Sequence, residues 1–255
     1  MIARDIKPDT RIANYVDRIL VIEFNGLSTG FELPLYANGV PTILFISQRG
    51  RIGKTVAAHL TLFGQTVIPQ NLTLAEGVTL IAYFFKPYSL LSLFKVAAWE
   101  LTDKPVDLRL LTPNSANELQ ERLLNAESIE STIKLMDNFV SCLIAKSKPD
   151  CPVIKYATTK IIANPSKEVL ISVQKELRMT ERTFQRNFES KIGVAPNQYR
   201  RISQFNSGFY QLNRRKFNKL SDIAFDWGYA DQSHYIRAFK EFTNLTPKEY
   251  LNFGT

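Results

Sequence analysis

The stretch Thr180–Tyr199, TERTFQRNFESKIGVAPNQY, is followed by a second version of itself at Asp231–Tyr250, DQSHYIRAFKEFTNLTPKEY. At a constant offset of 51 residues the matched pairs are Thr180 and Asp231, Phe184 and Tyr235, Arg186 and Arg237, Phe188 and Phe239, Pro196 and Pro247, and Tyr199 and Tyr250. Self-similarity at a fixed period indicates a duplicated structural unit.

Each copy predicts a capped helix. Thr180 and Asp231 carry side-chain oxygens that can accept hydrogen bonds from the free N–H groups of a first helical turn. The two aromatic residues of each copy are four positions apart and fall on one helical face. Gly193 and Asn244 tolerate the left-handed conformation that ends a helix, and the proline three residues later suits the first turn of the next one.

The arginine of each copy is expected on the outer face. Arg186 and Arg237 stand two positions after the first aromatic residue. On a helix of 3.6 residues per turn this rotates them by roughly 200° from it. The aromatic stripe can therefore be buried while the arginine reaches solvent or a partner.

A short helix is predicted before each copy. Leu220–Tyr229 reads as a short helix that ends in a glycine turn, and Ser166–Met179 as a helix with Ser166 as its cap. A short helix, a tight turn and a capped helix with outward polar residues form the helix-turn-helix pattern. The sequence contains this pattern twice.

The charge distribution favours a polyanion as the partner of the same region. Residues 1–150 hold 15 basic and 15 acidic side chains, whereas residues 151–255 hold 17 basic and 9 acidic ones, so the whole net charge of +8 lies in the second part. A basic domain that carries two helix-turn-helix patterns is typical of proteins that bind nucleic acid.

Several motifs at fixed spacing resemble the C-terminal signature of AraC/XylS-type transcription regulators: Ile223-Ala224, Gly228-Tyr229, Ser233-His234-Tyr235, Arg237-Ala238-Phe239-Lys240 and Thr246–Tyr250. The resemblance covers roughly residues 153–252. It implies a seven-helix domain that binds double-stranded DNA, with RNA polymerase as a further expected partner and activation as the commoner outcome. It also implies a linker helix over residues 196–212, ~25 Å long, which suits major-groove segments about 34 Å apart.

The first unit departs from that family pattern at three positions. Arg178 stands where a turn glycine is usual, Gln174 where a small alanine is usual, and Gln204 where the linker helix usually carries arginine. A residue other than glycine in a left-handed turn costs on the order of 1 kcal/mol. The first unit is therefore expected to be the less regular one.

The residues predicted to contact DNA lie on the outer faces of the two recognition helices: Arg182, Gln185 and Arg186 in the first, and Gln232, Ser233, His234 and Arg237 in the second. The family resemblance assigns base contacts to the three in the first helix. Arginine can donate two hydrogen bonds to guanine, and glutamine can pair with adenine. The alternative for each of them is a phosphate contact or a plain surface position.

The first half of the chain predicts strands followed by helices, which gives an α+β fold class overall. Strands are expected at residues 15–24, 42–47, 56–63 and 78–85, and helices at 88–98, 113–125 and 128–145. A small barrel and a sandwich both fit this pattern. The prolines around Lys146–Pro152 suggest a linker, so the expected domains are 1–148 and 149–255.

The function of the first domain is open between two hypotheses, which can hold together. Its motifs at Ile12–Val16 and Ala82–Pro87 resemble an uncharacterised domain of one subgroup of AraC-type regulators. As a sensor, it would hold a small-molecule effector in a barrel lined by Phe45, Phe63, Tyr83 and Phe85. As a dimerisation domain, it would offer the apolar seam of residues 128–145 to a second copy of the chain.

Other classes are disfavoured. The only histidines are His59 and His234, so no metal site or cofactor is expected, and no nucleophile motif or phosphate loop points to an enzyme. Cys142 and Cys151 read as free thiols. The absence of a signal or membrane-spanning segment predicts a cytoplasmic protein.

The main prediction is a sequence-specific, one-component bacterial transcription regulator. Two alternatives stay open: a basic protein that coats DNA without sequence preference, and a helix-turn-helix domain that serves as a protein-protein adaptor. Arginine and glutamine on both recognition helices favour the first reading.

Overall fold

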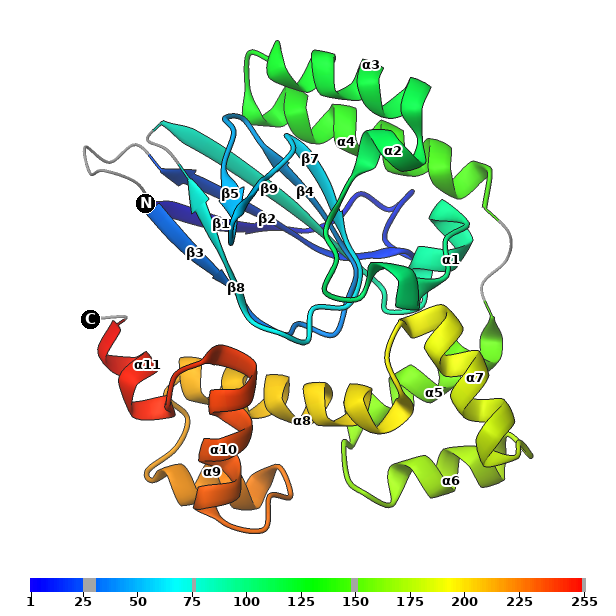
Figure 1. Ribbon diagram of the computed structural model, residues 1–255, viewed down its shortest axis with the longest axis vertical. Coiled ribbons are helices and arrows are strands. Elements are labelled where there is room, and N and C mark those ends of the chain that lie inside the picture. Colours follow the sequence, from blue (N-terminus) through cyan, green and yellow to red (C-terminus); the bar gives the residue numbers. More distant parts are fainter. Residues whose placement is uncertain (25–30, 75–76, 148–150, 254–255) are drawn as a thin grey trace.

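The computed structural model of the chain describes residues 1–24, 31–74, 77–147 and 151–253 (Figure 1). Its strands are β1 (Ile2–Ile6), β2 (Val16–Phe24), β3 (Phe31–Leu35), β4 (Thr42–Ile46), β5 (Arg51–Ile52), β6 (Thr55–Val56), β7 (Leu60–Phe63), β8 (Gln70–Leu74), β9 (Val78–Phe85) and β10 (Val106–Asp107). Its helices are α1 (Ser89–Phe94), the 3-10 helix η1 (Ala98–Leu101), α2 (Leu108–Leu111), α3 (Pro113–Leu124), α4 (Ile129–Ala145), α5 (Pro152–Ala163), α6 (Val169–Glu176), α7 (Glu181–Ile192), α8 (Pro196–Asn213), α9 (Leu220–Asp226), α10 (Gln232–Thr243) and α11 (Pro247–Phe253).

The N-terminal domain contains two antiparallel sheets, which confirms the α+β class and selects the sandwich over the closed barrel. The larger sheet has the order β1-β2-β9-β4-β7-β10, and the smaller one the order β3-β8-β5-β6. One apolar cluster joins residues of both sheets, including Leu44 and Leu80 of the larger sheet with Leu72 and Leu74 of the smaller. Helices α1 to α4 gather at the larger sheet, away from the smaller one (Figure 1).

The central strands of the larger sheet are buried on both faces, since helices cover one face and the smaller sheet covers the other. Side chains alternate along each strand, so neighbouring residues belong to different cores. In β9, Tyr83 and Phe85 pack with the helices, whereas Leu80 and Ala82 pack toward the smaller sheet. Phe45 belongs to the helical side and Phe63 to the side between the sheets. The prediction that Phe45, Phe63, Tyr83 and Phe85 line one ligand cavity is therefore wrong, since strand alternation sends them to opposite faces.

The apolar seam of α4 packs on its own domain. Met136 and Val140 are fully buried against the larger sheet. The hydroxyl of Tyr83 donates to the Asp137 carboxylate at 2.7 Å and so fixes the helix to β9. This seam is occupied within the chain, so the proposal that it binds a second copy loses its basis.

Two predicted elements of the N-terminal domain are interrupted. The helix expected over residues 88–98 ends at Phe94, because Lys95 adopts the left-handed conformation (φ 59°) and η1 follows. The strand expected over residues 56–63 divides into β6 and β7, since Ala57 donates its N–H to the Gly50 carbonyl and the chain then crosses between the sheets.

One predicted helix cap is also wrong. Helix α6 begins at Val169 after Glu168, which makes no side-chain capping bond, and Ser166 lies outside the helix. The Ser166 hydroxyl instead bonds to the Glu168 carboxylate. The pKa of that carboxyl is lowered mainly by a backbone hydrogen bond and next by the bond from Ser166.

Some predictions fall on residues that the structure leaves undescribed. Asn25-Gly26 and Glu76-Gly77 predict turns between strands. Asn25, Gly26 and Glu76 lie outside the described ranges, as does the proposed domain boundary at 148–149. The sequence GRIGK at Gly50–Lys54 predicts a hairpin turn. The structure confirms it, because β5 and β6 pair with Ile52 opposite Thr55, and Gly53 supplies a positive φ of 56°.

The C-terminal half is helical, with α5 to α11 as its seven helices within residues 151–253. One core cluster joins α5, α6 and α7 to the start of α8, and another joins α9, α10 and α11 to the rest of α8. Helix α8 therefore runs between two helical units and belongs to both (Figure 1). This confirms the linker helix predicted over residues 196–212.

The two halves of the chain are in contact. The Thr102 hydroxyl, directly after η1, donates to the Gly193 carbonyl at the end of α7 at 2.7 Å. Val67 packs against the cores of both helical units. Tyr36 contacts the rings of Phe209 and Tyr250 edge-on, with centroids 5.7 and 6.2 Å apart. The N-terminal domain thus touches both units directly.

Candidate nucleic-acid interface

Helices α7 and α10 have the same architecture. Each has 12 residues. Thr180 accepts from the N–H of Thr183 at 3.3 Å, and Asp231 accepts from the N–H of His234 at 2.7 Å. Gly193 (φ 99°) and Asn244 (φ 63°) end the two helices in the left-handed conformation. The caps predicted from the repeat are confirmed.

The turn before each helix contains an equivalent hydrogen bond. Met179 donates its N–H to the Gln174 carbonyl at 3.1 Å, as Tyr229 does to Ala224 at 2.9 Å. Arg178 (φ 51°) takes the left-handed position that Gly228 (φ 67°) takes in the second unit. The first turn is thus as regular as the second, although its arginine bears the steric cost of a side chain at positive φ.

The two turns differ in length by one residue. Met179 is followed directly by the cap Thr180, whereas Ala230 separates Tyr229 from the cap Asp231. The recognition helices therefore match at an offset of 51 residues and the turns at 50. In the longer turn, the N–H of Ala230 donates to Nδ1 of His234 at 3.2 Å.

The apolar face of each recognition helix is buried. Phe184 and Phe188 of α7, and Tyr235 and Phe239 of α10, have no exposed surface. Their rings contact one another, residues of α8, and Tyr229 in the second turn. This packing fixes the rotation of each helix about its own axis and so decides which side chains face outward.

Three arginines occupy the outer faces. Arg182 and Arg186 on α7, and Arg237 on α10, are exposed. None of them has a hydrogen bond or ion pair to another residue in the described ranges. Their guanidinium groups are thus free to donate to an external acceptor, and two of the three lie on the same helix.

The other predicted contact residues differ in availability. Gln232 and Ser233 are exposed at the start of α10. Gln185 is exposed, but its amide donates to the Glu189 carboxylate at 2.9 Å. His234 is half-buried, with its ring edge-on to Tyr229 at 5.2 Å. We interpret His234 chiefly as a residue that shapes the turn, with Nδ1 already occupied.

A buried polar bridge on α8 was missed by the sequence analysis. Arg200 donates to the Pro165 carbonyl at 2.9 Å and to the side-chain oxygen of Gln204 at 3.0 Å. The amide nitrogen of Gln204 in turn donates to the Trp227 carbonyl at 2.7 Å. Pro165 precedes α6 and Trp227 ends α9, so the pair connects the first unit to the turn of the second.

The bridge explains why this chain accepts Gln204 where the resemblance leads us to expect arginine. Arg200 and Gln204 are 6 % and 5 % exposed. Burial lowers the pKa of the Arg200 guanidinium, and the neighbouring Arg201 lowers it further. A second arginine at position 204 would place a like charge against Arg200 in a buried site. Only the departure from the family pattern could have marked this position in the sequence.

A basic loop lies beside the second unit. Arg214, Arg215 and Lys216 follow α8 and are exposed, and the Arg214 guanidinium lies over the Tyr210 ring at 4.2 Å. Either a phosphate contact or a solubilising role fits this loop.

Comparisons with known proteins match both halves of the chain. Residues 173–252 match the family described as a helix-turn-helix domain, and residues 4–107 match a domain of unknown function, DUF6597. The matched helix-turn-helix region contains both recognition helices and the α8 linker. The first match agrees with the resemblance of the C-terminal region to AraC/XylS-type transcription regulators. The comparison with curated proteins gives no significant match.

Solved structures of ToxT from Vibrio cholerae share the fold. One, at 1.65 Å resolution, has a TM-score of 0.54 and 15 % identity over 92 % of this chain and 98 % of ToxT. A second, bound to (E)-4-(8-methylnaphthalen-1-yl)but-3-enoic acid, has a TM-score of 0.55 and 14 % identity over 93 % and 99 %. A third, bound to an unsaturated fatty acid, has a TM-score of 0.51 and 14 % identity over 96 % of both chains. The chain shares its overall fold with all three.

Three further features of the chain bear on the sequence predictions. Within the described residues, none of the helices combines the length and apolar character that a membrane crossing requires. Cys142 and Cys151 are both free thiols, as predicted. Across the same ranges, histidine, cysteine and carboxylate side chains do not gather in groups of three that could bind a metal.

Proposed function

We propose that this regulator binds specific DNA sequences by placing α7 and α10 in two successive segments of one major-groove face. The observation that carries the proposal is the set of three exposed, unpaired arginines, Arg182, Arg186 and Arg237, on two helices that present equivalent faces. Arginine is the side chain that most often reads guanine in the major groove, through two hydrogen bonds to O6 and N7.

The spacing of the units supports reading by both helices. Helix α8 has 18 residues, which corresponds to a length of ~27 Å at 1.5 Å per residue. Successive major-groove segments on one face of DNA are about 34 Å apart. Helix α8 joins the two units that hold the recognition helices, and the Arg200–Gln204 bridge connects these units.

We further propose that a small molecule bound by the N-terminal domain controls this binding, so that one chain both senses and responds. Support comes from the direct contact of that domain with both units and from its fold, which is shared with ToxT structures that hold an unsaturated fatty acid or an aryl butenoic acid. Such a protein would act in the cytoplasm, where bacterial DNA lies. Dimer formation, contact with RNA polymerase and activation stay predictions.

The test is selection of bound duplexes from a random DNA pool with the full chain at moderate salt. We expect a motif with two half-sites about one helical turn apart. Two substitutions at one position then separate base reading from phosphate contact. Arg237→Ala removes the guanidinium, while Arg237→Lys keeps the charge but cannot form the bidentate pair. Lys134→Ala, which changes an exposed base on α4, is the control.

If Arg237 reads a base, both variants lose preference at one base pair, and Arg237→Ala costs ~1 to 3 kcal/mol on the selected site. If Arg237→Lys retains the motif and Arg237→Ala weakens all sequences equally, then Arg237 contacts phosphate. Failure of the wild-type protein to select any motif would refute sequence-specific binding and favour the non-specific or adaptor reading.

A further inference from the structure

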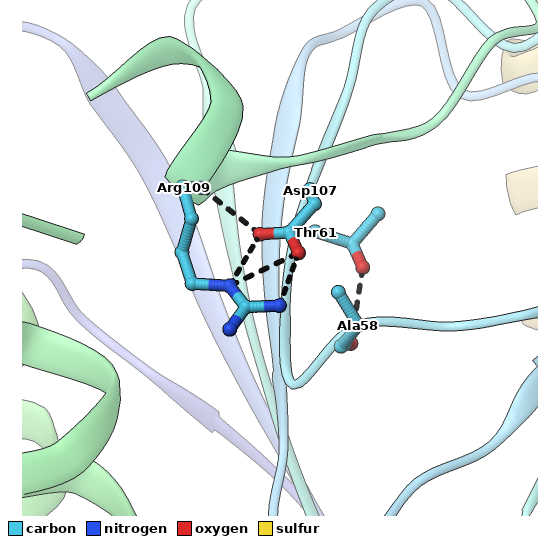
Figure 2. Close-up of polar contacts among 4 residues, drawn as sticks. All are labelled: Ala58, Thr61, Asp107 and Arg109. Carbon is cyan, nitrogen blue, oxygen red and sulfur yellow. Dashed lines mark hydrogen bonds and ion pairs between the residues drawn. The ribbon is translucent and has the colours of Figure 1, made fainter. Parts of the chain in front are cut away.

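A cavity of about 610 Å³ opens at the side of the N-terminal domain. The β5–β6 hairpin, β7 and residues 103–109 form its walls, and Gln120 of α3 completes them. Figure 2 shows part of this wall, with Arg109 and Asp107 beside Thr61 and Ala58. Its size is in the range of small-molecule sites. The cavity is distinct from the aromatic one expected from the sequence, and its lining is largely polar.

Arg109 is held in place by Asp107, and part of its guanidinium group has no hydrogen-bond partner in the described part of the chain. Its Nε and Nη2 donate to the Asp107 carboxylate at distances of 2.6 to 3.0 Å, and its backbone N–H donates to the same group at 2.9 Å. This side-chain hydrogen bond is the main reason that the pKa of the Asp107 carboxyl is lowered, so Asp107 stays charged. The Nη1 group of Arg109 lacks a hydrogen-bond partner in the described part of the chain. A pre-oriented guanidinium with free donors suits a carboxylate ligand.

Other polar groups on the cavity wall are unpaired as well. Arg49 is exposed and forms no ion pair within the described ranges. The Nδ1 of His59 lies 2.8 Å from the Ile46 carbonyl and donates to it, and in the neutral ring Nε2 is then an acceptor. The side-chain oxygen of Gln120 is buried without a partner. The site therefore offers free donors to an anion and free acceptors to hydroxyl or amino groups.

The charges limit the ligand to a small one with low net charge. Arg49 and Arg109 are balanced by Asp103 and Asp107 on the same wall. Such a site suits a single negative charge better than a polyanion. Apolar contact is confined to a few side chains, among them Ile52 and Val56, so a long alkyl chain would find little surface to cover.

We infer that this cavity is the effector site of the regulator and binds a small organic monoanion that also carries hydroxyl or amino groups. The effector role rests on the proposed function, whereas the binding of the anion does not. A carboxylate would accept from Arg109 and Arg49, and the donor groups of the ligand would reach Gln120, His59 and the free oxygen of Asp103.

The cavity wall leads directly to the first recognition helix. The Asp103 carboxylate accepts from the N–H groups of Val67 and Ile68 at 2.7 and 2.9 Å. Val67 packs on the cores of both helical units, and Thr102, the residue before Asp103, donates to the Gly193 carbonyl at the end of α7. A ligand that engages Asp103 therefore acts on a segment in contact with both units.

Titration calorimetry with the full chain, in the absence of DNA, tests the site. The probes are gluconate and glucuronate, which are monoanions with hydroxyl groups, compared with glucose, acetate and oleate. We expect saturable heat from at least one of the two sugar acids and weaker or no binding of the three comparison compounds. Arg109→Gln should reduce affinity by about tenfold to a hundredfold, because it removes a charged donor.

Arg51→Gln is the matched control, since Arg51 lies on the same hairpin, bonds to the Lys54 carbonyl and is outside the cavity lining. Should Arg109→Gln fail to fold, Gln120→Leu decides, with an expected loss of about tenfold. Absence of saturable heat from both sugar acids would overturn the inference, as would binding of oleate alone or an equal loss in Arg51→Gln.

The effector role is tested separately by fluorescence anisotropy with the selected duplex, with and without the sugar acid that binds. We expect the ligand to change DNA affinity in the wild-type protein. In Thr102→Val, which lacks the hydrogen bond to Gly193, we expect that change to disappear while calorimetric binding persists. A ligand that binds but leaves wild-type DNA affinity unchanged would refute the effector role. A protein that selects no DNA but binds the ligand would refute the proposed function instead.

Discussion

The Arg200–Gln204 bridge gives the sharpest test of how the two helix-turn-helix units are held together. Gln204→Leu replaces the amide with an apolar side chain of similar volume, so its effect comes mainly from hydrogen bonds rather than from a cavity. It removes the donor to the Trp227 carbonyl at 2.7 Å and the acceptor for Arg200 at 3.0 Å. Both groups lie in the junction between α8 and the second turn.

The expected cost follows from what each partner keeps. A buried carbonyl left without a donor costs ~1 to 3 kcal/mol, and Trp227 loses its side-chain donor here. Arg200 keeps its bonds to the Pro165 carbonyl at 2.9 Å and to Asn197 at 3.2 Å, so it loses only about 1 kcal/mol. We therefore expect the free energy of unfolding to fall by roughly 2 to 4 kcal/mol.

Urea denaturation of the full chain at neutral pH measures this change. Gln198→Leu is the control, because Gln198 lies on the same helix but bonds to Arg201, which also pairs with Glu241 near the surface. We expect that variant to change stability by less than about 0.5 kcal/mol. If Gln204→Leu costs no more than Gln198→Leu, the bridge does not hold the units together and the reasoning is wrong.

Three further substitutions test the turns and the buried carboxyl. Gly193→Ala should lower the free energy of unfolding by roughly 2 kcal/mol or more, because φ is 99° and a Cβ would lie 2.8 Å from the Ala98 carbonyl; an unchanged urea midpoint would contradict this. Arg178→Gly should raise it by up to about 1 kcal/mol by relieving the positive φ of 51°, and a loss of stability would show that the arginine has a structural role. For Asp137, burial raises the pKa of the carboxyl, with Asp9 adding to the rise while the Tyr83 hydrogen bond and Arg11 oppose it. Between the unfolded and the folded pKa only the folded state holds the proton, so stability should fall as pH rises through that interval. Asp137→Asn should lack this fall. If the urea midpoints of the variant and the wild-type protein change with pH in the same way, the assignment to Asp137 is refuted.

The helices of the repeat could be predicted because their signals are local. Thr180 and Asp231 act as caps within one turn, and the aromatic pairs that turn each helix toward the core are four residues apart. Strands such as β1 and β3 were missed for the opposite reason. β1 is an exposed edge strand without apolar alternation. β3 alternates Phe31, Leu33 and Leu35 with other positions, but it contains Pro34, which argues against a strand.

The candidate DNA contacts were predicted from the repeat, but the elements that connect the domains were not. Thr102 and Gly193 are 91 positions apart, and Gln204 and Trp227 are 23 apart. Each contact joins a side chain to a backbone carbonyl. Because every residue has a backbone carbonyl, the sequence does not mark which residue is the partner. The polar cavity is similar, because Arg49, Arg109 and Gln120 come from separate elements that only the folded sheet brings together.

These contacts are unequal between the two units, and this asymmetry bears on control. The first unit receives a hydrogen bond at the C-terminal end of its recognition helix, from Thr102 to Gly193, whereas the second meets the N-terminal domain through the rings of Tyr36, Phe209 and Tyr250. A hydrogen bond at a helix end is directional, while ring packing tolerates small shifts. A displacement of residues 98–103 should therefore move α7 more than α10. Since both helices must fit one duplex at once, a small tilt of α7 alone is enough to change DNA affinity.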